Sequence, residues 1–298
     1  EKTKGPRRPD PHIMTTHDAL VGTLPGVRLE NDTHVCEITR FGAHVASWRV
    51  KRTSDELLFR SKLAKLDGTK AIRGGVPVCF PQFSDMGPCA QSHGFARTSV
   101  WAVEALSATE VTMVLRRGDE AGDGDAFGGD YEARFTATLD GDALRTALRV
   151  TNAGKSCFEF TSALHTYFRV SDCAKTKVRG LRGTTYLDNL RARASAKDDE
   201  DAVEFSGEVD RIYTDAPSVL TIDDEALGRR FRVAKTSTFP DAVVWNPALT
   251  DKTRGMSDFG DEEYREMVCV EVAGVKDKIT VEPGETWEAS QTISYSAI

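Results

Sequence analysis

This chain has little of the material from which membrane proteins, metalloproteins and disulfide-stabilised proteins are built. No apolar run reaches the roughly 18 to 20 residues that a membrane-spanning helix needs, and we see no secretory apolar segment near the start. The six cysteines among 298 residues are scattered, with no C-x-x-C pair and no histidine spacing suited to zinc. We therefore expect free thiols in a reducing compartment, no metal and no membrane partner.

Positive charge is also in short supply. Lysine and arginine number 39 against 46 aspartates and glutamates, which gives a formal net charge of −7. A molecule of this charge repels nucleic acid and anionic membranes as a whole, so we expect no nucleic-acid partner. An anionic small molecule would have to be drawn by a local group of cationic side chains.

A sustained helical period is nearly absent, and short strand-like runs take its place. From Val27 to the C-terminus, runs rich in β-branched residues are separated by Gly, Asp or Asn. This spacing predicts an all-β fold, a large antiparallel sandwich or barrel-like domain. No linker divides it, so residues 27–298 are expected to form a single domain.

The first 26 residues are expected to form a poorly ordered N-terminal extension. The segment is rich in Lys, Arg and Pro, and the chain does not begin with Met. Residues 1–13 are either an added segment before Met14 or the remnant of a processed presequence. We expect the protein in the cytoplasm, or in the stroma or matrix of an organelle if a presequence was removed.

The densest group of candidate site residues lies between Ala71 and Trp101. Arg73 precedes two glycines, Arg97 follows His93-Gly94, and two prolines between them flank the segment 78–80. Glycine lets a backbone approach a ligand closely, and proline stiffens the chain around it. Two guanidinium groups on stiffened loops could bind an anion with paired hydrogen bonds. An ordinary surface role for either arginine is an equally good interpretation of the residues alone.

Two further residues have the chemistry of an acid and base pair. His165 lies in an alternating segment whose Leu164 and Phe168 favour the core, which turns His165 to the opposite face with Tyr167. Glu271 lies in a nearly continuous apolar run, where burial raises the basicity of a carboxylate. A structural histidine and an ion-paired glutamate are the alternatives.

Other candidates are weaker when the residues are taken alone. Gln82 is a plausible ligand for a hydroxyl group, and His93 is a candidate for ligand binding because Gly94 follows it. Asp210 follows a turn and is as well explained by turn hydrogen bonds. Trp245 could face a ligand or lie in the core. Lys70 could add charge near Arg73, but a solvated lysine is the favoured interpretation.

Several of these segments resemble one known family. The runs Arg73-Gly-Gly-Val-Pro, Phe80-Pro-Gln-Phe and Ser92-His-Gly-Phe-Ala-Arg resemble the pattern of the D-hexose-6-phosphate mutarotases, also called glucose-6-phosphate 1-epimerases, which are relatives of the aldose 1-epimerases. Ser92 stands where that pattern has Gln. The segments around His165, Asp210-Arg-Ile-Tyr and Cys269-Val-Glu are similar to family segments as well.

The resemblance implies a fold and a reaction. It implies a galactose mutarotase-like β-sandwich that binds sugar in an open groove and interconverts the α and β anomers of a hexose 6-phosphate without a cofactor. His165 and Glu271 would be the acid and the base, and Asp210 would hold sugar hydroxyls. Arg73 and Arg97 would bind the phosphate. The protein is expected to be a monomer.

Three other functions remain compatible with the residues. A carbohydrate-binding module could use the same groove without catalysis, and a structural subunit could keep an old enzyme fold. A glycoside hydrolase would need two carboxylates flanking the bond, and Asp210 with Glu271 is the evident pair.

Overall fold

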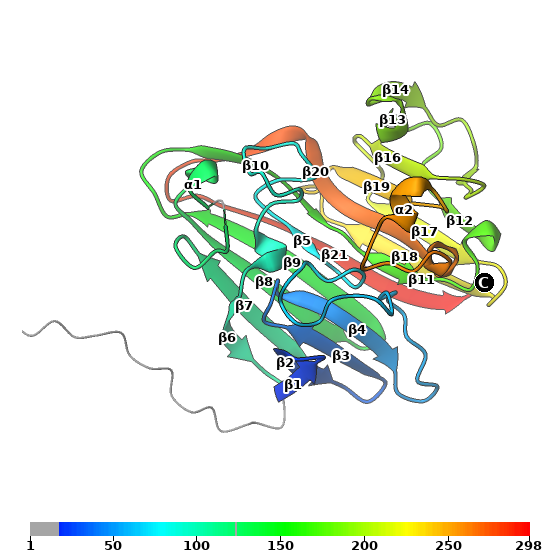
Figure 1. Ribbon diagram of the computed structural model, residues 1–298, viewed down its shortest axis with the longest axis horizontal. Helices are drawn as coiled ribbons and strands as arrows, with labels where there is room; N and C mark the ends of the chain where they lie inside the picture. Colours follow the sequence, from blue (N-terminus) through cyan, green and yellow to red (C-terminus); the bar gives the residue numbers. More distant parts are fainter. Residues whose placement is uncertain (1–17, 123) are drawn as a thin grey trace, which may run out of the picture.

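β-Strands dominate the protein. The computed structural model describes residues 18–122 and 124–298, and Figure 1 shows its strands gathered into sheets. The strands of these sheets pair in antiparallel fashion, and they form a four-stranded, an eight-stranded and a nine-stranded sheet. The expected all-β antiparallel class is confirmed.

The smallest sheet is formed by the N-terminal part of the described chain. Its strands follow one another in order: β1 (Asp18–Val21), β2 (Leu24–Glu30), β3 (His34–Thr39) and β4 (His44–Val50). Asp18 lies opposite Val27 in the β1–β2 pair. The expected start of the folded domain at residue 27 is therefore wrong, because strands begin nine residues earlier. The remainder of the expected extension, residues 1–17, lies outside the described residues.

The nine-stranded sheet forms one wide layer. Its order is β15-β12-β17-β18-β21-β9-β8-β7-β6, and its last strand in sequence, β21, is coloured red in Figure 1. The strands are β6 (Ala102–Leu106), β7 (Glu110–Arg116), β8 (Tyr131–Asp140), β9 (Ala143–Asn152), β12 (Thr176–Arg179), β15 (Ala202–Val203), β17 (Val219–Asp224), β18 (Arg229–Lys235) and β21 (Thr286–Ala297).

The eight-stranded sheet carries the residues of interest. Its order is β14-β13-β16-β19-β20-β10-β5, with β11 paired to β20. The strands are β5 (Val78–Cys79), β10 (Phe158–Leu164), β11 (Tyr167–Arg169), β13 (Thr185–Asp188), β14 (Ala194–Lys197), β16 (Val209–Tyr213), β19 (Asp241–Asn246) and β20 (Met267–Val281). The alternating segment around His165 forms two strands, β10 and β11, and His165 lies in the break between them.

Helices are short wherever the structure describes the chain. They are η1 (Ala96–Thr98), α1 (Gly124–Phe127), η2 (Cys173–Lys175), η3 (Asn189–Arg191), α2 (Asp251–Arg254) and η4 (Glu263–Glu266). Short helices of this kind connect strands and hold loops in place.

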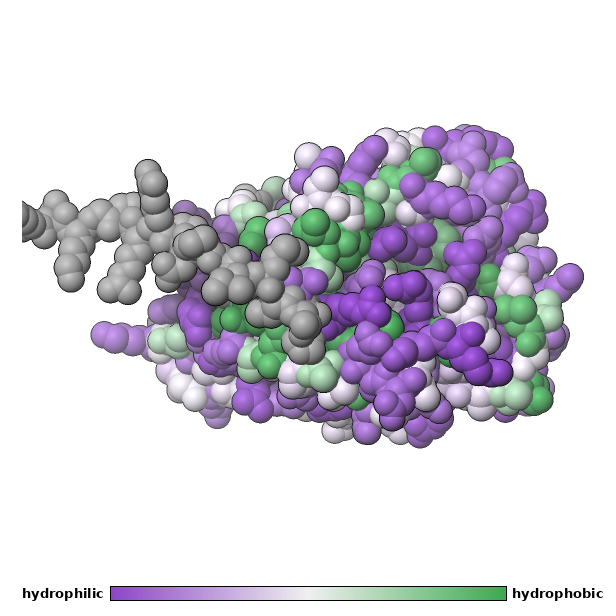
Figure 2. All heavy atoms as spheres, turned by 90° about the horizontal axis from the view of Figure 1, so that it is seen from below, coloured by the Kyte–Doolittle hydropathy of each residue, from purple (hydrophilic) through white to green (hydrophobic). Residues whose placement is uncertain are grey.

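One hydrophobic core joins the three sheets. It includes Ile38 from the four-stranded sheet, Val270 from the eight-stranded sheet, and Phe135 and Ile293 from the nine-stranded sheet. Apolar side chains removed from water stabilise such a layered packing. On the face seen in Figure 2, hydrophilic residues predominate and apolar ones lie between them.

Two further expectations concern free thiols and membrane-spanning segments. All six cysteines lie within the described residues, and each has a free thiol. Among the residues that the structure describes, no helix is both long and apolar enough to cross a lipid bilayer.

Candidate functional site

The alternation of side chains along β20 turns Glu271 away from the core. Val268, Val270 and Val272 lie in the main core, so the residues between them face the other side of the sheet. Residues that lie opposite each other on neighbouring strands share a face. Glu271 lies opposite Val243 of β19, and Asp210 of β16 lies opposite Trp245. This outer face of the eight-stranded sheet is therefore the floor of a site.

A cavity of about 330 Å³ lies on this face and contains most of the predicted site residues. Strands supply one part of its lining, and the segments 73–97 and 252–256 supply another. The lining includes six of the seven predicted site residues: Arg73, His93, Arg97, His165, Asp210 and Glu271. The structure thus brings together side chains that are more than a hundred residues apart in the chain.

His165 and Glu271 lie next to each other at the floor of this cavity. His165 Nδ1 is 3.4 Å from Glu271 Oε1, and both residues are buried. Neither His165 Nδ1 nor Glu271 Oε2 has a hydrogen-bond partner among the described residues. Buried polar atoms without partners are costly and are usually explained by function or by a missing ligand. The pair is therefore poised to interact with a molecule in the cavity.

Neighbouring aromatic rings fix the imidazole of His165. The Tyr167 ring stacks on it with centroids 4.8 Å apart and planes 9° apart, and Trp245 meets it edge-on at 5.9 Å. The backbone N–H of His165 donates to the carbonyl of Pro77 at 3.0 Å. The ring has little freedom to turn away from Glu271.

Burial shifts the pKa values of this pair in opposite directions. Burial, together with the positive charges of Arg97 and Arg73, lowers the pKa of His165 to about 3. Burial raises the pKa of Glu271 well above its usual value, and the negative charge of Asp210 adds to this effect. When the pair holds one proton, that proton therefore resides on Glu271 while the cavity holds no ligand.

Asp210 and Trp245 lie beside the pair on neighbouring strands. Asn189 Nδ2 donates a hydrogen bond to Asp210 Oδ1 at 2.6 Å, which orients the carboxylate. Burial is the main cause that raises the pKa of Asp210. The other carboxylate oxygen is left to accept hydrogen bonds from a ligand, and the Trp245 ring offers an apolar wall.

His93 is held in one orientation by its neighbours. Its Nδ1 accepts a hydrogen bond from the backbone N–H of Ser84 at 3.1 Å and lies 3.3 Å from Cys79 Sγ. Burial and the charge of Arg97 lower the pKa of His93 well below its usual value. The neutral ring therefore carries its proton on Nε2, which makes that nitrogen a hydrogen-bond donor.

Gln82 does not reach the cavity. Its amide nitrogen donates to the carbonyls of Ser84, Cys89 and Gln91, and its amide oxygen accepts from the N–H of Cys89. The side chain is fully buried in these contacts. The predicted role as a hydroxyl ligand is wrong, because the amide group is fully buried and bonds to the backbone of the 84–91 loop.

Replacing Gln82 by Ala should therefore destabilise the protein. Buried backbone groups of the 84–91 loop would lose their partner, and we expect the free energy of unfolding to fall by about 1 to 3 kcal/mol. Thermal unfolding measures this directly. Gln91→Ala is the control, since that half-buried side chain bonds only to Thr98 among the described residues. A raised KM with unchanged stability would instead restore Gln82 as a ligand.

Arg97 is a cation that makes no ion pair with a carboxylate among the described residues. Its Nη2 donates to the carbonyl of Ser92 at 2.7 Å, and its buried Nε has no partner there. Burial is the main cause that lowers the pKa of Arg97, although the group stays charged at any working pH. An anion in the cavity would supply the missing partner.

Arg73 is partly neutralised, unlike Arg97. Its Nη2 lies 3.4 Å from Asp258 Oδ2, and its Nη1 donates to the hydroxyl of Tyr167 at 3.3 Å. Burial acts to lower the pKa of Arg73, but Tyr167 and Asp258 outweigh it and raise the value. Lys70, which we expected to be solvated, lies 3.1 Å from the other oxygen of Asp258.

The two arginines and Ser92 also line a second cavity of about 530 Å³, beside the first. Lys70, Tyr167 and Asp258 contribute to its wall. Three cationic side chains and one buried carboxylate therefore lie at this junction, which carries net positive charge in a protein of net charge −7. This is the local cationic group that an anionic ligand requires.

The glycines after Arg73 have a different role from the one expected. A Cβ at Gly75 would lie 2.1 Å from the carbonyl oxygen of Val45, and one at Gly74 would lie 2.4 Å from the backbone of Phe59 and Arg60. These glycines let two backbone segments meet, rather than a backbone and a ligand. They fix Arg73 by packing its loop against β4 and the segment after it.

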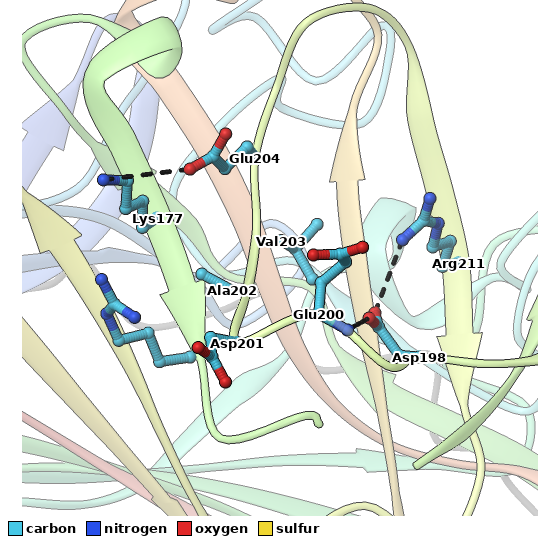
Figure 3. A pocket seen from close by; sticks show the side chains of 9 residues that line it. Lys177, Asp198, Glu200, Asp201, Ala202, Val203, Glu204 and Arg211 are labelled. Carbon is cyan, nitrogen blue, oxygen red and sulfur yellow. Dashed lines mark hydrogen bonds and ion pairs between the residues drawn. The ribbon is translucent and has the colours of Figure 1, made fainter. Parts of the chain in front are cut away.

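Another cavity contains none of the predicted site residues. It measures about 510 Å³ and is shown in Figure 3, where Lys177 points to Glu204 and Arg211 points to Asp198. Asp198 also accepts a hydrogen bond from the Tyr213 hydroxyl at 2.6 Å. Two of its cations therefore pair with carboxylates of the same cavity. None of the buried polar atoms that lack a hydrogen-bond partner among the described residues belongs to its lining.

Sequence reasoning missed several residues at the site. Asn189 orients Asp210 from a short helix, and Asp258 binds Arg73 and Lys70, yet the sequence around each is typical of an ordinary loop. Lys252 and Met256 also line the first cavity. Only Tyr167 had a local signal, because it alternates with His165 along the chain.

Comparison with known proteins gives consistent matches over most of the chain. A family model described as aldose 1-epimerase matches residues 25–294. The chain is 40% identical over 285 residues to a candidate glucose-6-phosphate 1-epimerase from Cenchrus ciliaris, covering 91% of this chain and 84% of that one. It is 34% identical over 251 residues to one from Escherichia coli K12, with coverage of 78% and 77%. A crystal structure of a candidate mutarotase from Salmonella typhimurium superimposes with a TM-score of 0.82 at 26% identity, with coverage of 94% and 93%.

Proposed function

Because this chain belongs to the aldose 1-epimerase family, we propose that it is an isomerase that interconverts the α and β anomers of an aldohexose 6-phosphate, with glucose 6-phosphate as its substrate. The expected galactose mutarotase-like fold is confirmed by solved structures of that kind. The observation that carries the proposal is the arrangement in one cavity of the buried His165–Glu271 pair and the unpaired cation of Arg97.

The reaction needs one proton removed and one delivered. Glu271 takes the proton from the hydroxyl on C1, and the electron pair of that O–H bond becomes part of the new C1 carbonyl. The bond between C1 and the ring oxygen breaks, its electron pair stays on the ring oxygen, and His165 protonates that oxygen. The aldehyde end then rotates about the C1–C2 bond, and the reverse transfers close the ring as the other anomer.

One proton shared by the pair is sufficient for both directions. Ring opening begins with the proton on His165 and ends with it on Glu271, and ring closure returns it. In the free protein the opposite pKa shifts place this proton on Glu271. The pair then starts in the state that closes a ring, so binding of substrate has to move the proton towards His165.

The phosphate of the substrate can cause that shift. The positive charges of Arg97 and Arg73 are the electrostatic contributions that lower the pKa of His165. A phosphate that carries about −1.5 to −2 charge at pH 7 offsets them when it binds between the two guanidinium groups. The pKa of His165 rises as a result. Recognition of the phosphate thus supports the chemical step as well as binding.

The remaining cavity residues suit the sugar itself. Asp210, oriented by Asn189, accepts hydrogen bonds from ring hydroxyls, and His93 Nε2 donates one. Trp245 and Phe83 provide apolar wall beside them. Polar groups at the edge and an aromatic ring at the face are the usual means of holding a hexose.

A coupled assay tests the proposed function. Fresh α-glucose 6-phosphate is mixed with a dehydrogenase that accepts only the β anomer, and the protein should raise the rate above spontaneous anomerisation in proportion to its concentration. Heat-denatured protein is the control. Tight binding of glucose 6-phosphate without any increase in rate would identify a binding module and contradict the proposal.

A further inference from the structure

Cys269 is a buried thiol that lies next to the catalytic pair and has no part in the proposed reaction. It precedes Glu271 by two residues in β20, so both side chains leave the strand on the same face. Cys269 is fully buried and lies opposite Tyr167 of β11. It packs in one cluster with Tyr167 and Trp245, the rings that contact His165, so its sulfur lies beside the catalytic pair.

The three side chains converge on one point. A ring nitrogen of His165, Cys269 Sγ and a carboxylate oxygen of Glu271 all lie within 4.8 Å of one another. Two ligands of one zinc ion are about 3.3 to 3.7 Å apart, given metal–ligand distances of about 2.0 to 2.3 Å and tetrahedral angles. The His165–Glu271 separation of 3.4 Å already has this value. Small side-chain movements would bring the sulfur to the same range.

The donor atoms are also free to accept a metal. His165 Nδ1 and Glu271 Oε2 are buried and have no hydrogen-bond partner within the described residues. A nitrogen, a sulfur and a carboxylate oxygen form the donor set that zinc and related soft divalent cations prefer. A bound cation would satisfy the atoms that the fold leaves without partners.

We propose, on the basis of the function argued above, that His165, Cys269 and Glu271 form an inhibitory site for a soft divalent cation, Zn²⁺ or Cd²⁺. The ion binds the three side chains, the thiol proton is released to solvent, and water from the cavity completes the coordination. Because the ion uses the acid and the base of the reaction as ligands, anomerisation stops while it is bound.

The surrounding charges set the strength of this site. Arg73 and Arg97 line the same cavity and repel a cation, whereas Asp210 attracts one. The site is therefore weaker than a closed structural zinc site of four ligands, and a chelator such as EDTA restores activity. The substrate phosphate would bind the two arginines, whereas the metal would bind His165, Cys269 and Glu271. The phosphate and the metal therefore do not compete for the same side chains.

The test compares metal binding and inhibition in three proteins. Cd²⁺ is titrated into the wild type, Cys269→Ser and Cys157→Ser, and the ultraviolet thiolate-to-metal absorption band is recorded. Zn²⁺ inhibition is measured in the coupled assay. Cys157 is the exposed thiol of the chain, so Cys157→Ser should behave as the wild type does. Cys269→Ser should retain activity, lose the band, and need a Zn²⁺ concentration higher by at least about 10- to 100-fold for equal inhibition.

The outcomes separate this inference from the proposed function. A band that is lost in Cys269→Ser supports the site even if the protein shows no isomerase activity. His165→Gln, read by the same band and by the Zn²⁺-dependent rise in thermal stability, gives a second measurement if Cys269→Ser folds poorly. Equal inhibition of the wild type and Cys269→Ser, or no band in the wild type, would overturn the proposal.

Discussion

Replacing Glu271 by Gln or His165 by Gln should lower the catalysed rate of anomer exchange by about 10²- to 10⁴-fold, the usual contribution of a general acid or base. Each change keeps a side chain of similar size in a buried position and removes the ability to exchange a proton. Because one proton passes between the two residues, loss of either stops the cycle. The double variant should therefore be little slower than each single variant, since residues that act as a unit are not additive.

The rate is measured by polarimetry on fresh α-glucose 6-phosphate, after subtraction of spontaneous anomerisation. Two matched controls exist in the same fold. Glu56 is a partly buried glutamate that accepts hydrogen bonds from Ser47 and the Trp48 N–H, and His34 is a buried histidine that contacts Tyr295. Glu56→Gln and His34→Gln should keep normal turnover. Full activity in Glu271→Gln would rule out the acid and base assignment.

Replacing Arg97 by Ala should separate the use of glucose 6-phosphate from the use of glucose. We expect kcat/KM for glucose 6-phosphate to fall by about 10- to 100-fold, because a hydrogen bond to a charged group contributes about 1.5 to 3 kcal/mol. Activity on unphosphorylated glucose should change little. When the substrate is unphosphorylated glucose, loss of the Arg97 charge raises the pKa of His165 and so favours protonation of its ring.

Arg73→Ala should show the same preference with a smaller effect, since Asp258 already neutralises part of the charge of Arg73. The control is Arg149→Ala, which removes an exposed arginine paired with Glu288 on the nine-stranded sheet. It should leave both activities unchanged. An equal loss of activity on glucose and on glucose 6-phosphate in Arg97→Ala would mean that the residue supports the fold and not the phosphate.

Local patterns predicted the elements and the side of the sheet on which the main residues lie. The alternation around His165 placed Leu164 and Phe168 in the core, and the structure confirms this. The apolar run around Glu271 correctly indicated burial of its carboxylate. Both inferences hold because side chains on a strand alternate between two faces, whatever the rest of the chain does.

Contacts between distant segments could not be predicted in the same way. The pairing of Asn189 with Asp210 and of Asp258 with Arg73 depends on how loops cross the sheet. Gln82 was misassigned because a glutamine beside a candidate site has the same sequence whether it faces a ligand or its own loop. The N-terminal boundary was placed late because a four-residue strand such as β1 has too few residues to show a period.

The position of β20 in its sheet determines which features of the site can be altered by mutation. Glu271 is carried by an interior strand with neighbours on both sides, whereas Arg73 and Arg97 lie on connecting segments. Amide hydrogens in the centre of a sheet exchange slowly, and those of loops exchange faster. Mutations in the loops can therefore retune which charged tail is accepted, while the spacing of the proton-transfer groups stays fixed by the sheet.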